Sequence, residues 1–258
     1  MEEMYDKSKH VEDTFNEENL SKYLLQAQRT EFIKLKKAII ELYKKKKSPL
    51  KILDIGIGNA RILKLFFQDK EIWERIEHYE GIDIAQNCIN ISKKVIKDLK
   101  IEKKASVKLL DAVKLKTLNK KYDLIISTWF TVGNFYPFNF DFKKFKPGYD
   151  MSTNDKFTII LKQAYEMLNQ SGEIIIGSMY IDNEETRKKQ EDSYRKFGWT
   201  IRTNEKDCFT ATKDGWWSQR FTKQRVYDYL NFISKENISF ISLDKYNYAM
   251  MVKIKNNN

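Results

Sequence analysis

The chain has 258 residues, of which 41% are hydrophobic and 14% aromatic, and this composition excludes a wholly disordered protein. Its apolar runs are short and interrupted by charge, so we expect no transmembrane segment and no signal peptide. The formal net charge of +11 leaves a nucleic-acid partner possible but does not favour one, because the positive residues are mostly scattered lysines. The densest run, Lys44 to Lys47, follows an amphipathic segment and is typical of a solvated helix end.

The two cysteines, Cys88 and Cys208, stand far apart and lack the spacing of a metal site. We therefore expect no metal cofactor. Scarce cysteine fits a reducing compartment, so a cytoplasmic protein is expected. The sequence indicates no particular oligomeric state.

The first two-thirds of the chain begin with helical patterns and continue with alternating strands and helices. Residues 1–16 are polar and expected to be loose, whereas residues 17–43 have apolar side chains at helical spacing and predict one or two helices. Strands are predicted at 50–54, 78–83, 106–110, 122–127 and 173–179. Helices are predicted at 59–67, 85–99 and 153–168. Such alternation with short connections predicts a parallel sheet with helices on both faces.

The end of the chain departs from this alternation. A helical stretch at 184–197 precedes an extended region at 199–221, and another helix is predicted at 222–234. Two further strands, 238–244 and 248–255, are separated by only a few residues. Because a parallel pair needs a crossover of about a dozen residues or more, these two strands must be antiparallel.

The stretch Asp54-Ile55-Gly56-Ile57-Gly58-Asn59 follows the first predicted strand, where ligands of open parallel sheets bind. Glycines at this point let the backbone approach a ligand closely. The dinucleotide fingerprint G-x-G-x-x-G is not met, since Leu63 stands near the position of the third glycine, and no P-loop lysine is present.

Acids follow the next two predicted strands. Asp83 ends the second strand and has the place of a carboxylate that accepts ribose hydroxyls, and Asp111, after the third, can accept from an exocyclic adenine amine. Each acid alone is more often a helix cap. Their repetition at successive strand ends favours a ligand site.

Taken together, "LDIGIGNAR", "GIDIA", "LLDAV" and "YDLIIST" resemble the class I S-adenosylmethionine-dependent methyltransferases, over about residues 50–255. This resemblance implies an α/β fold with a seven-stranded, mostly parallel Rossmann-like sheet, an antiparallel C-terminal hairpin and helices on both faces. It also implies a helical lid at residues 1–47 and a methyltransferase domain at 48–258, with substrate-covering insertions near 129–152 and 183–221.

The resemblance implies S-adenosylmethionine as cofactor and assigns its contacts. Gly56 and Gly58 would pass under the methionine part, Asp54 would organise that turn, Asp83 would hold the ribose and Asp111 the adenine. Asn59-Ala60 departs from the many members that have glycine at one of these positions. The full set of expected cofactor residues is Asp54, Gly56, Gly58, Asn59, Asp83, Ile84, Asp111, Ala112, Ser127 and Thr128.

The region after the fourth strand is unusually aromatic, with nine aromatic residues between Trp129 and Tyr149. It predicts either a hydrophobic lid packed on the core or an aromatic pocket for the methyl acceptor. The residues Ser127 to Phe130 lack the Asn/Asp-Pro-Pro-aromatic tetrapeptide of the amino-methyltransferases that act on bases, and no nucleophilic cysteine for cytosine-C5 chemistry is placed there.

Part of this region, "TVGNFYP", is weakly similar to a loop of the histidine and glycine N-methyltransferases. By that similarity Asn134 and Tyr136, with Trp129, are candidates for positioning an amine or amino-acid-like substrate. Phe130 is expected to line the same pocket.

Two more segments are candidates for covering the site. In "DGWWSQRF" the adjacent tryptophans face opposite sides of a strand, so Trp217 is a candidate substrate contact; Arg220 would either bind a substrate carboxylate or form a surface salt bridge. In the N-terminal helical region, Tyr23, with Gln28 and Arg29, would either cover the site or pack against the sheet edge.

The expected reaction is transfer of a methyl group to a small-molecule acceptor, at the nitrogen of an amine or amino-acid-like compound. Neither His10, in the polar N-terminus, nor His78, at a strand start, is placed to act as a base, which favours nitrogen over oxygen, although Asp, Glu or Tyr can also serve. The alternatives are a methyltransferase acting on RNA, such as cap or tRNA, or on a protein side chain, and a catalytically silent cofactor-binding scaffold.

Overall fold

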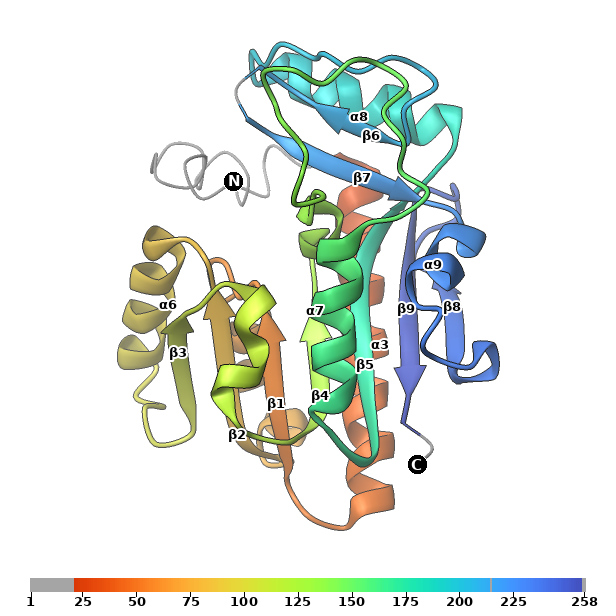
Figure 1. The fold of residues 1–258 in the computed structure, drawn as a ribbon. Helices are drawn as coiled ribbons and strands as arrows, with labels where there is room; N and C mark the ends of the chain where they lie inside the picture. Colours follow the sequence, from red (N-terminus) through yellow and green to blue (C-terminus); the bar gives the residue numbers. More distant parts are fainter. Residues whose placement is uncertain (1–20, 214, 257–258) are drawn as a thin grey trace.

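The computed structural model describes residues 21–213 and 215–256. The predicted loose segment 1–16, with His10, and the first residues of the predicted helical region, 17–20, lie outside the described residues. Over the described part the main elements are the expected ones (Figure 1).

Within the described residues, nine strands form one sheet. Five run parallel in the order β3-β2-β1-β4-β5, and β9 pairs antiparallel with β5 and with β8. The seven strands that the sequence predicted are β1 (Leu50–Ile55), β2 (Ile76–Asp83), β3 (Ala105–Leu109), β4 (Tyr122–Ser127), β5 (Leu168–Ile181), β8 (Ile238–Ser242) and β9 (Ala249–Lys255).

The predicted count of seven strands is corrected to nine by β6 (Phe209–Ala211) and β7 (Trp217–Phe221), which form in the region predicted only as extended. β5 continues beyond Ile176, the last of its residues paired on the neighbouring β4, so that its edge is open at Tyr180 and Ile181. β7 pairs parallel with these two residues, and β6 adds to β7 as an antiparallel neighbour.

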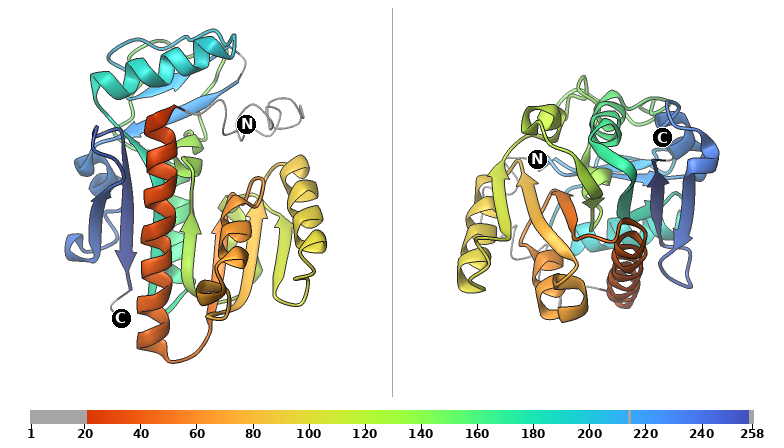
Figure 2. Two further views of the ribbon diagram at one scale, coloured as in Figure 1. Left: turned by 180° about the vertical axis from the view of Figure 1, so that it is seen from behind. Right: turned by 90° about the horizontal axis from the view of Figure 1, so that it is seen from below.

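Helices cover both faces of the sheet (Figure 2). One face is covered by α3 (Lys22–Lys46), α4 (Arg61–Gln68), α5 (Lys70–Trp73) and α6 (Gln86–Asp98), and the other by α7 (Asp155–Glu166) and α9 (Lys223–Tyr229). In the described part the N-terminal region is a single helix, α3, whose last turn contains Lys44 to Lys46. No helix in the described ranges is long and apolar enough to cross a bilayer.

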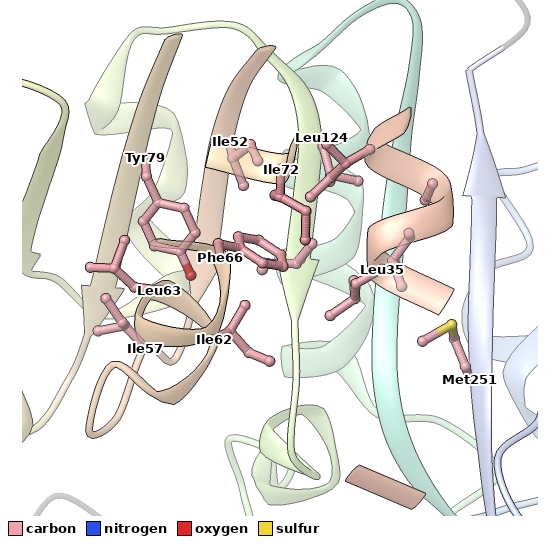
Figure 3. Close-up of a cluster of buried hydrophobic side chains, with 14 of the residues drawn as sticks. Leu35, Ile52, Ile57, Ile62, Leu63, Phe66, Ile72, Tyr79, Leu124 and Met251 are labelled. Atoms are coloured by element: carbon pink, nitrogen blue, oxygen red, sulfur yellow. The ribbon is translucent and has the colours of Figure 1, made fainter. Parts of the chain in front are cut away.

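The core beneath α3 and α4 holds the glycine turn in place. Figure 3 shows Leu35 of α3 and Phe66 of α4 packed against Ile52 and Leu124 of the sheet. The third glycine of the fingerprint would stand at position 61, which is Arg61. Leu63, two residues further along α4, is fully buried in this cluster and packs in the core.

A further layer lies over the carboxyl ends of the parallel strands. It consists of residues 129–152 together with residues 184–213 and 215–221, which include α8 (Glu184–Lys196), β6 and β7, and is called the cap below (Figure 1). Much of the aromatic run packs within the cap: Phe140, Phe145 and Tyr149 surround Phe209 and Trp217. The sheet and the cap thus enclose the ends of the strands.

Candidate active site

A cavity of about 1490 Å³ lies at the carboxyl ends of the parallel strands, between the sheet and the cap. Single small-molecule sites typically occupy about 300–1,000 Å³. The cavity therefore has room for two small molecules side by side. One half is bordered by the turns after β1, β2 and β3, and the other by the turn after β4 and by the cap.

The glycine turn after β1 presents bare backbone to this cavity. Gly56 and Gly58 have φ of +79° and +56°, and a Cβ on Gly56 would lie 2.3 Å from the Cγ2 atom of Thr131. The amides of Gly56 and Ile57 donate to the carbonyl of Ile82 at 2.8 and 3.0 Å, which ties the turn to β2. Glycine is required here because side chains are strained at such φ.

Ala60 occupies the position where the sequence departs from the expected glycine. Its φ is +58°, and it immediately precedes α4 as the N-cap residue. The left-handed conformation costs a non-glycine residue roughly 1–2 kcal/mol. Ala60 thus adopts a backbone conformation that favours glycine.

Asp83 and Asp111 both line the cavity, and Asp111 is also a helix cap, whereas Asp83 binds two backbone amides without capping a helix. Asp83 accepts the amide of Gly58 on Oδ2 and that of Ala85 on Oδ1, both at 2.9 Å. Burial raises the pKa of Asp83, and the backbone amides of Ala85 and Gly58 oppose this rise. Asp111 accepts the amide of Val113 at 3.1 Å, at the start of a short 3₁₀ helix.

Four of the other expected cofactor residues border the cavity, and two lie behind it. The bordering residues are Asn59, Ile84, Ala112 and Thr128. Ser127 is buried and donates to the carbonyl of Ile55 at 2.8 Å, beneath the glycine turn. Asp54 is also buried outside the lining and accepts the Tyr79 hydroxyl.

The carboxyl group of Asp54 has an unusually high pKa. Burial raises its pKa to about 7, although the hydrogen bond from Tyr79 and the charge of Arg61 act in the opposite direction. Its second oxygen, Oδ1, has no hydrogen-bond partner among the described residues. The carboxyl group is thus buried directly before the glycine turn at an electrostatic cost.

We predict that this titration makes the protein less stable as the pH rises. The folded chain keeps the Asp54 proton up to a pH of about 7, whereas an unfolded aspartate loses it near pH 4, so the free energy of unfolding falls between these values. Between pH 5 and 7.5 the loss is about 2 kcal/mol. Asp54→Asn should remove this part of the pH dependence in urea denaturation. A variant with the same pH profile as the parent would contradict the prediction.

The other half of the cavity is bordered by Trp129, Phe130, Asn134 and Tyr136. Phe130 stacks on Tyr180 with ring centroids 3.8 Å apart. The side chain of Asn134 is buried, and its Oδ1 atom accepts no hydrogen bond from the described residues. The cap completes the wall with mainly aromatic side chains, among them Tyr194, Phe197, Trp199 and Trp216.

Three expected substrate contacts lie elsewhere. Trp217 is fully buried in the cap and stacks on Phe209 at 3.9 Å, whereas its neighbour Trp216 lines the cavity. Two adjacent strand residues face opposite sides, and the pairing of β6 with β7 turns Trp217 inward. Tyr23 packs against Lys189, whose Nζ lies 3.7 Å from the ring centroid, and Leu24 borders the cavity instead.

Arg220 is neither a surface salt bridge nor a cavity residue. Its side chain is fully buried within the cap, where Nη1 donates to Gln190 at 2.7 Å and to Thr210 at 2.8 Å. Nη2 donates to the Asp207 carbonyl, and Nε lies 3.5 Å from Asp182. Because its guanidinium makes these contacts inside the protein, Arg220 has a structural role.

Two residues that sequence reasoning missed join the site. Arg61, the first residue of α4, lines the cavity beside the glycine turn. Glu31 of α3 is completely buried and pairs with Arg61 at 2.6 Å. A signal was present, because Glu31 interrupts the stripe formed by Leu24, Ala27 and Leu35, which is otherwise apolar.

Comparison with known proteins agrees with this geometry. The family model described as "Methyltransferase domain" matches residues 46–232. No curated protein matches the chain. Among solved structures, the PH0226 protein of Pyrococcus horikoshii OT3 has a TM-score of 0.58 at 16% identity, covering 95% of each chain.

Two further solved structures share the fold. The 1,6-didemethyltoxoflavin-N1-methyltransferase of Burkholderia thailandensis has a TM-score of 0.56 at 10% identity, covering 100% of this chain and 88% of that one. An S-adenosylmethionine-dependent methyltransferase of Clostridium acetobutylicum ATCC 824 has a TM-score of 0.55 at 12% identity, covering 98% and 99%. At these identities the likeness concerns the fold. Together with the family match over most of its length, it identifies the chain as a member of the methyltransferase domain family, an S-adenosylmethionine-dependent enzyme on a Rossmann-like sheet.

Proposed function

We propose that the enzyme methylates a nitrogen atom of a small-molecule acceptor, an amine or an amino-acid-like compound. The observation that carries this proposal is the amide oxygen of Asn134, a residue that borders the cavity: this buried atom receives no hydrogen bond from the described residues. A buried polar atom without a partner is costly, and a ligand N–H removes that cost. A neutral amide oxygen suits an amine or amide N–H of the acceptor.

The cofactor is proposed to occupy the half of the cavity bordered by the glycine turn. Gly56 and Gly58 would face its methionine part, Asp83 its ribose hydroxyls, and Asp111 with Ala112 its adenine; Asn59, Ile84 and Thr128 would complete the contacts. The bare backbone of the turn and the two carboxylates suit these groups in shape and hydrogen bonding. When bound, the cofactor supplies an electrophilic methyl group on a sulfonium.

The surroundings of the second half favour nitrogen as the attacking atom. A neutral amine attacks without a strong base, whereas an alcohol needs one. His78 lies on β2 beside Ser106, at 2.9 Å, and is not among the residues that border the cavity. Burial raises the pKa of Tyr194 to about 12, which makes this cavity residue a poor base near neutral pH.

The aromatic walls and the enclosing cap support a small acceptor. Trp129 and Phe130 line the cavity together with Tyr194 and Trp216 of the cap, and aromatic walls bind flat or cationic groups and exclude water. The Burkholderia thailandensis neighbour is an N1-methyltransferase crystallised with 1,6-didemethyltoxoflavin and S-adenosylhomocysteine, which agrees with a small nitrogen acceptor.

The test is to offer S-adenosylmethionine labelled on the methyl group together with fractions of a cell extract. We expect the label to enter small molecules and to be recovered on nitrogen. Label in RNA, with RNA association that weakens steeply as salt is added, would favour the alternative of an RNA methyltransferase, for which the net charge of +11 is the main support. Label in a polypeptide would point to a protein substrate.

Once an acceptor is found, Asn134→Ala should lower kcat/KM by about 10- to 100-fold, because the acceptor N–H loses its partner. The affinity for S-adenosylhomocysteine should stay the same, since Asn134 borders the other half of the cavity. Asn231→Ala, at an exposed position, is the matched control. An unchanged kcat/KM for Asn134→Ala would overturn the proposed orientation of the acceptor.

A further inference from the structure

Glu31 is a carboxylate buried where three separate segments meet. Its Oε2 atom accepts from Nη2 of Arg61 at 2.6 Å. Its Oε1 atom accepts the amide of Trp129 at 3.2 Å and both the amide and the hydroxyl of Ser178, at 2.6 and 3.0 Å. One side chain of α3 therefore joins the start of α4, the turn after β4 and the middle of β5.

The lack of a side chain at Gly177 of β5 leaves room for the Glu31 carboxylate. A Cβ on Gly177 of β5 would lie 2.2 Å from Oε1 of Glu31. Burying an ion pair is expensive, and an apolar pair of similar volume is often as stable or more so. Stability alone therefore gives little reason for Glu31 at this position.

The residues that Glu31 binds, Arg61 and Trp129, lie at the boundary between the two halves of the cavity. Arg61, whose side chain is 16% exposed, borders the cavity next to the glycine turn and lies 5.3 Å from the Trp129 ring. Trp129 and Phe130 have φ of +52° and +62°, an unfavourable conformation for bulky residues. The Trp129 amide bonds to Glu31 and the Phe130 amide to the Ser178 carbonyl, so the strained turn is held from both sides.

We propose that Glu31 is a positioning residue of the cofactor site: it fixes the Arg61 guanidinium at the edge of the cavity, where that group receives the carboxylate of the cofactor's amino acid part. Guanidinium groups recognise carboxylates through paired N–H donors, and this recognition depends on orientation. Through Oε1 the same residue maintains the turn that separates cofactor from acceptor. This role does not depend on the identity of the acceptor.

The test compares two probes by titration calorimetry. S-adenosylhomocysteine has the amino acid part, whereas 5′-methylthioadenosine has the adenine, ribose and sulfur but lacks that part. Glu31→Gln keeps an acceptor for Trp129 and Ser178 but removes the charge that holds Arg61. We expect it to weaken S-adenosylhomocysteine about 10-fold and 5′-methylthioadenosine by less than about twofold.

Controls separate this role from a structural one. Arg61→Met should weaken S-adenosylhomocysteine at least as much as Glu31→Gln, and adding Glu31→Gln to it should change the affinity by less than about twofold. Glu41→Gln, a half-exposed glutamate of the same helix, should leave both probes unaffected. Equal weakening of the two probes, or no weakening, would overturn the proposal. If Glu31→Gln does not fold, Arg61→Met still decides, because it must discriminate between the probes.

Discussion

Replacing Asp83 with alanine is expected to weaken the binding of S-adenosylhomocysteine by about 100-fold, because hydrogen bonds to a charged group contribute about 1.5–3 kcal/mol. In the proposed complex the carboxylate accepts the ribose hydroxyls while it also binds the amides of Gly58 and Ala85. The replacement thus removes a ligand contact and loosens the glycine turn. Titration calorimetry measures the affinity.

Because Asp83→Ala also loosens the glycine turn, a second variant is needed to separate the two effects. Asp83→Asn keeps one oxygen as an acceptor for the backbone, so it should preserve the turn better and weaken binding less, by about 10-fold. Asp98→Ala, at an exposed position on α6, is the matched control and should bind as the parent does. Unchanged affinity in a folded Asp83→Ala protein would contradict the proposed cofactor position.

The parallel sheet could be predicted because its strands are continuous apolar runs. β4 was predicted with both ends correct at Tyr122 and Ser127, since all six of its residues are buried. The glycine turn and the acids Asp83 and Asp111 were found because each follows its strand directly, and the carboxyl ends of parallel strands meet at one edge. Local sequence was therefore enough to predict that these residues lie together at one end of the sheet, where they border the cavity.

The acceptor half depends on contacts between distant segments. Glu31 lies 98 residues from Trp129 and 147 from Ser178 along the chain, and no local pattern links them. β6 has three residues and β7 five, too few for a clear period of two. That adjacent tryptophans face opposite sides was predictable; which of them faces the cavity depended on the pairing of these short strands.

The surroundings of Arg220 also depend on distant segments, and they predict a large loss of stability when this residue is replaced. The sequence predicted that Arg220 binds a substrate carboxylate or forms a surface salt bridge, but its side chain is only 1% exposed and is surrounded by acceptors from α8, β6 and the segment before β6. Arg220→Met is expected to lower the free energy of unfolding by about 3–5 kcal/mol, because a buried charge network loses its central donor while its acceptors stay buried. Urea denaturation measures this loss.

The location of Arg220 also predicts what the variant should leave intact. No residue that borders the cofactor half of the cavity is a hydrogen-bond partner of Arg220, so S-adenosylhomocysteine should bind folded Arg220→Met within about threefold of the parent. Arg195→Met, an exposed arginine on α8, should change the free energy of unfolding by less than about 0.5 kcal/mol. If Arg220 bound the acceptor's carboxylate instead, Arg220→Met would keep its stability and raise the KM for the acceptor. The two roles therefore predict opposite patterns of stability and affinity in a single variant.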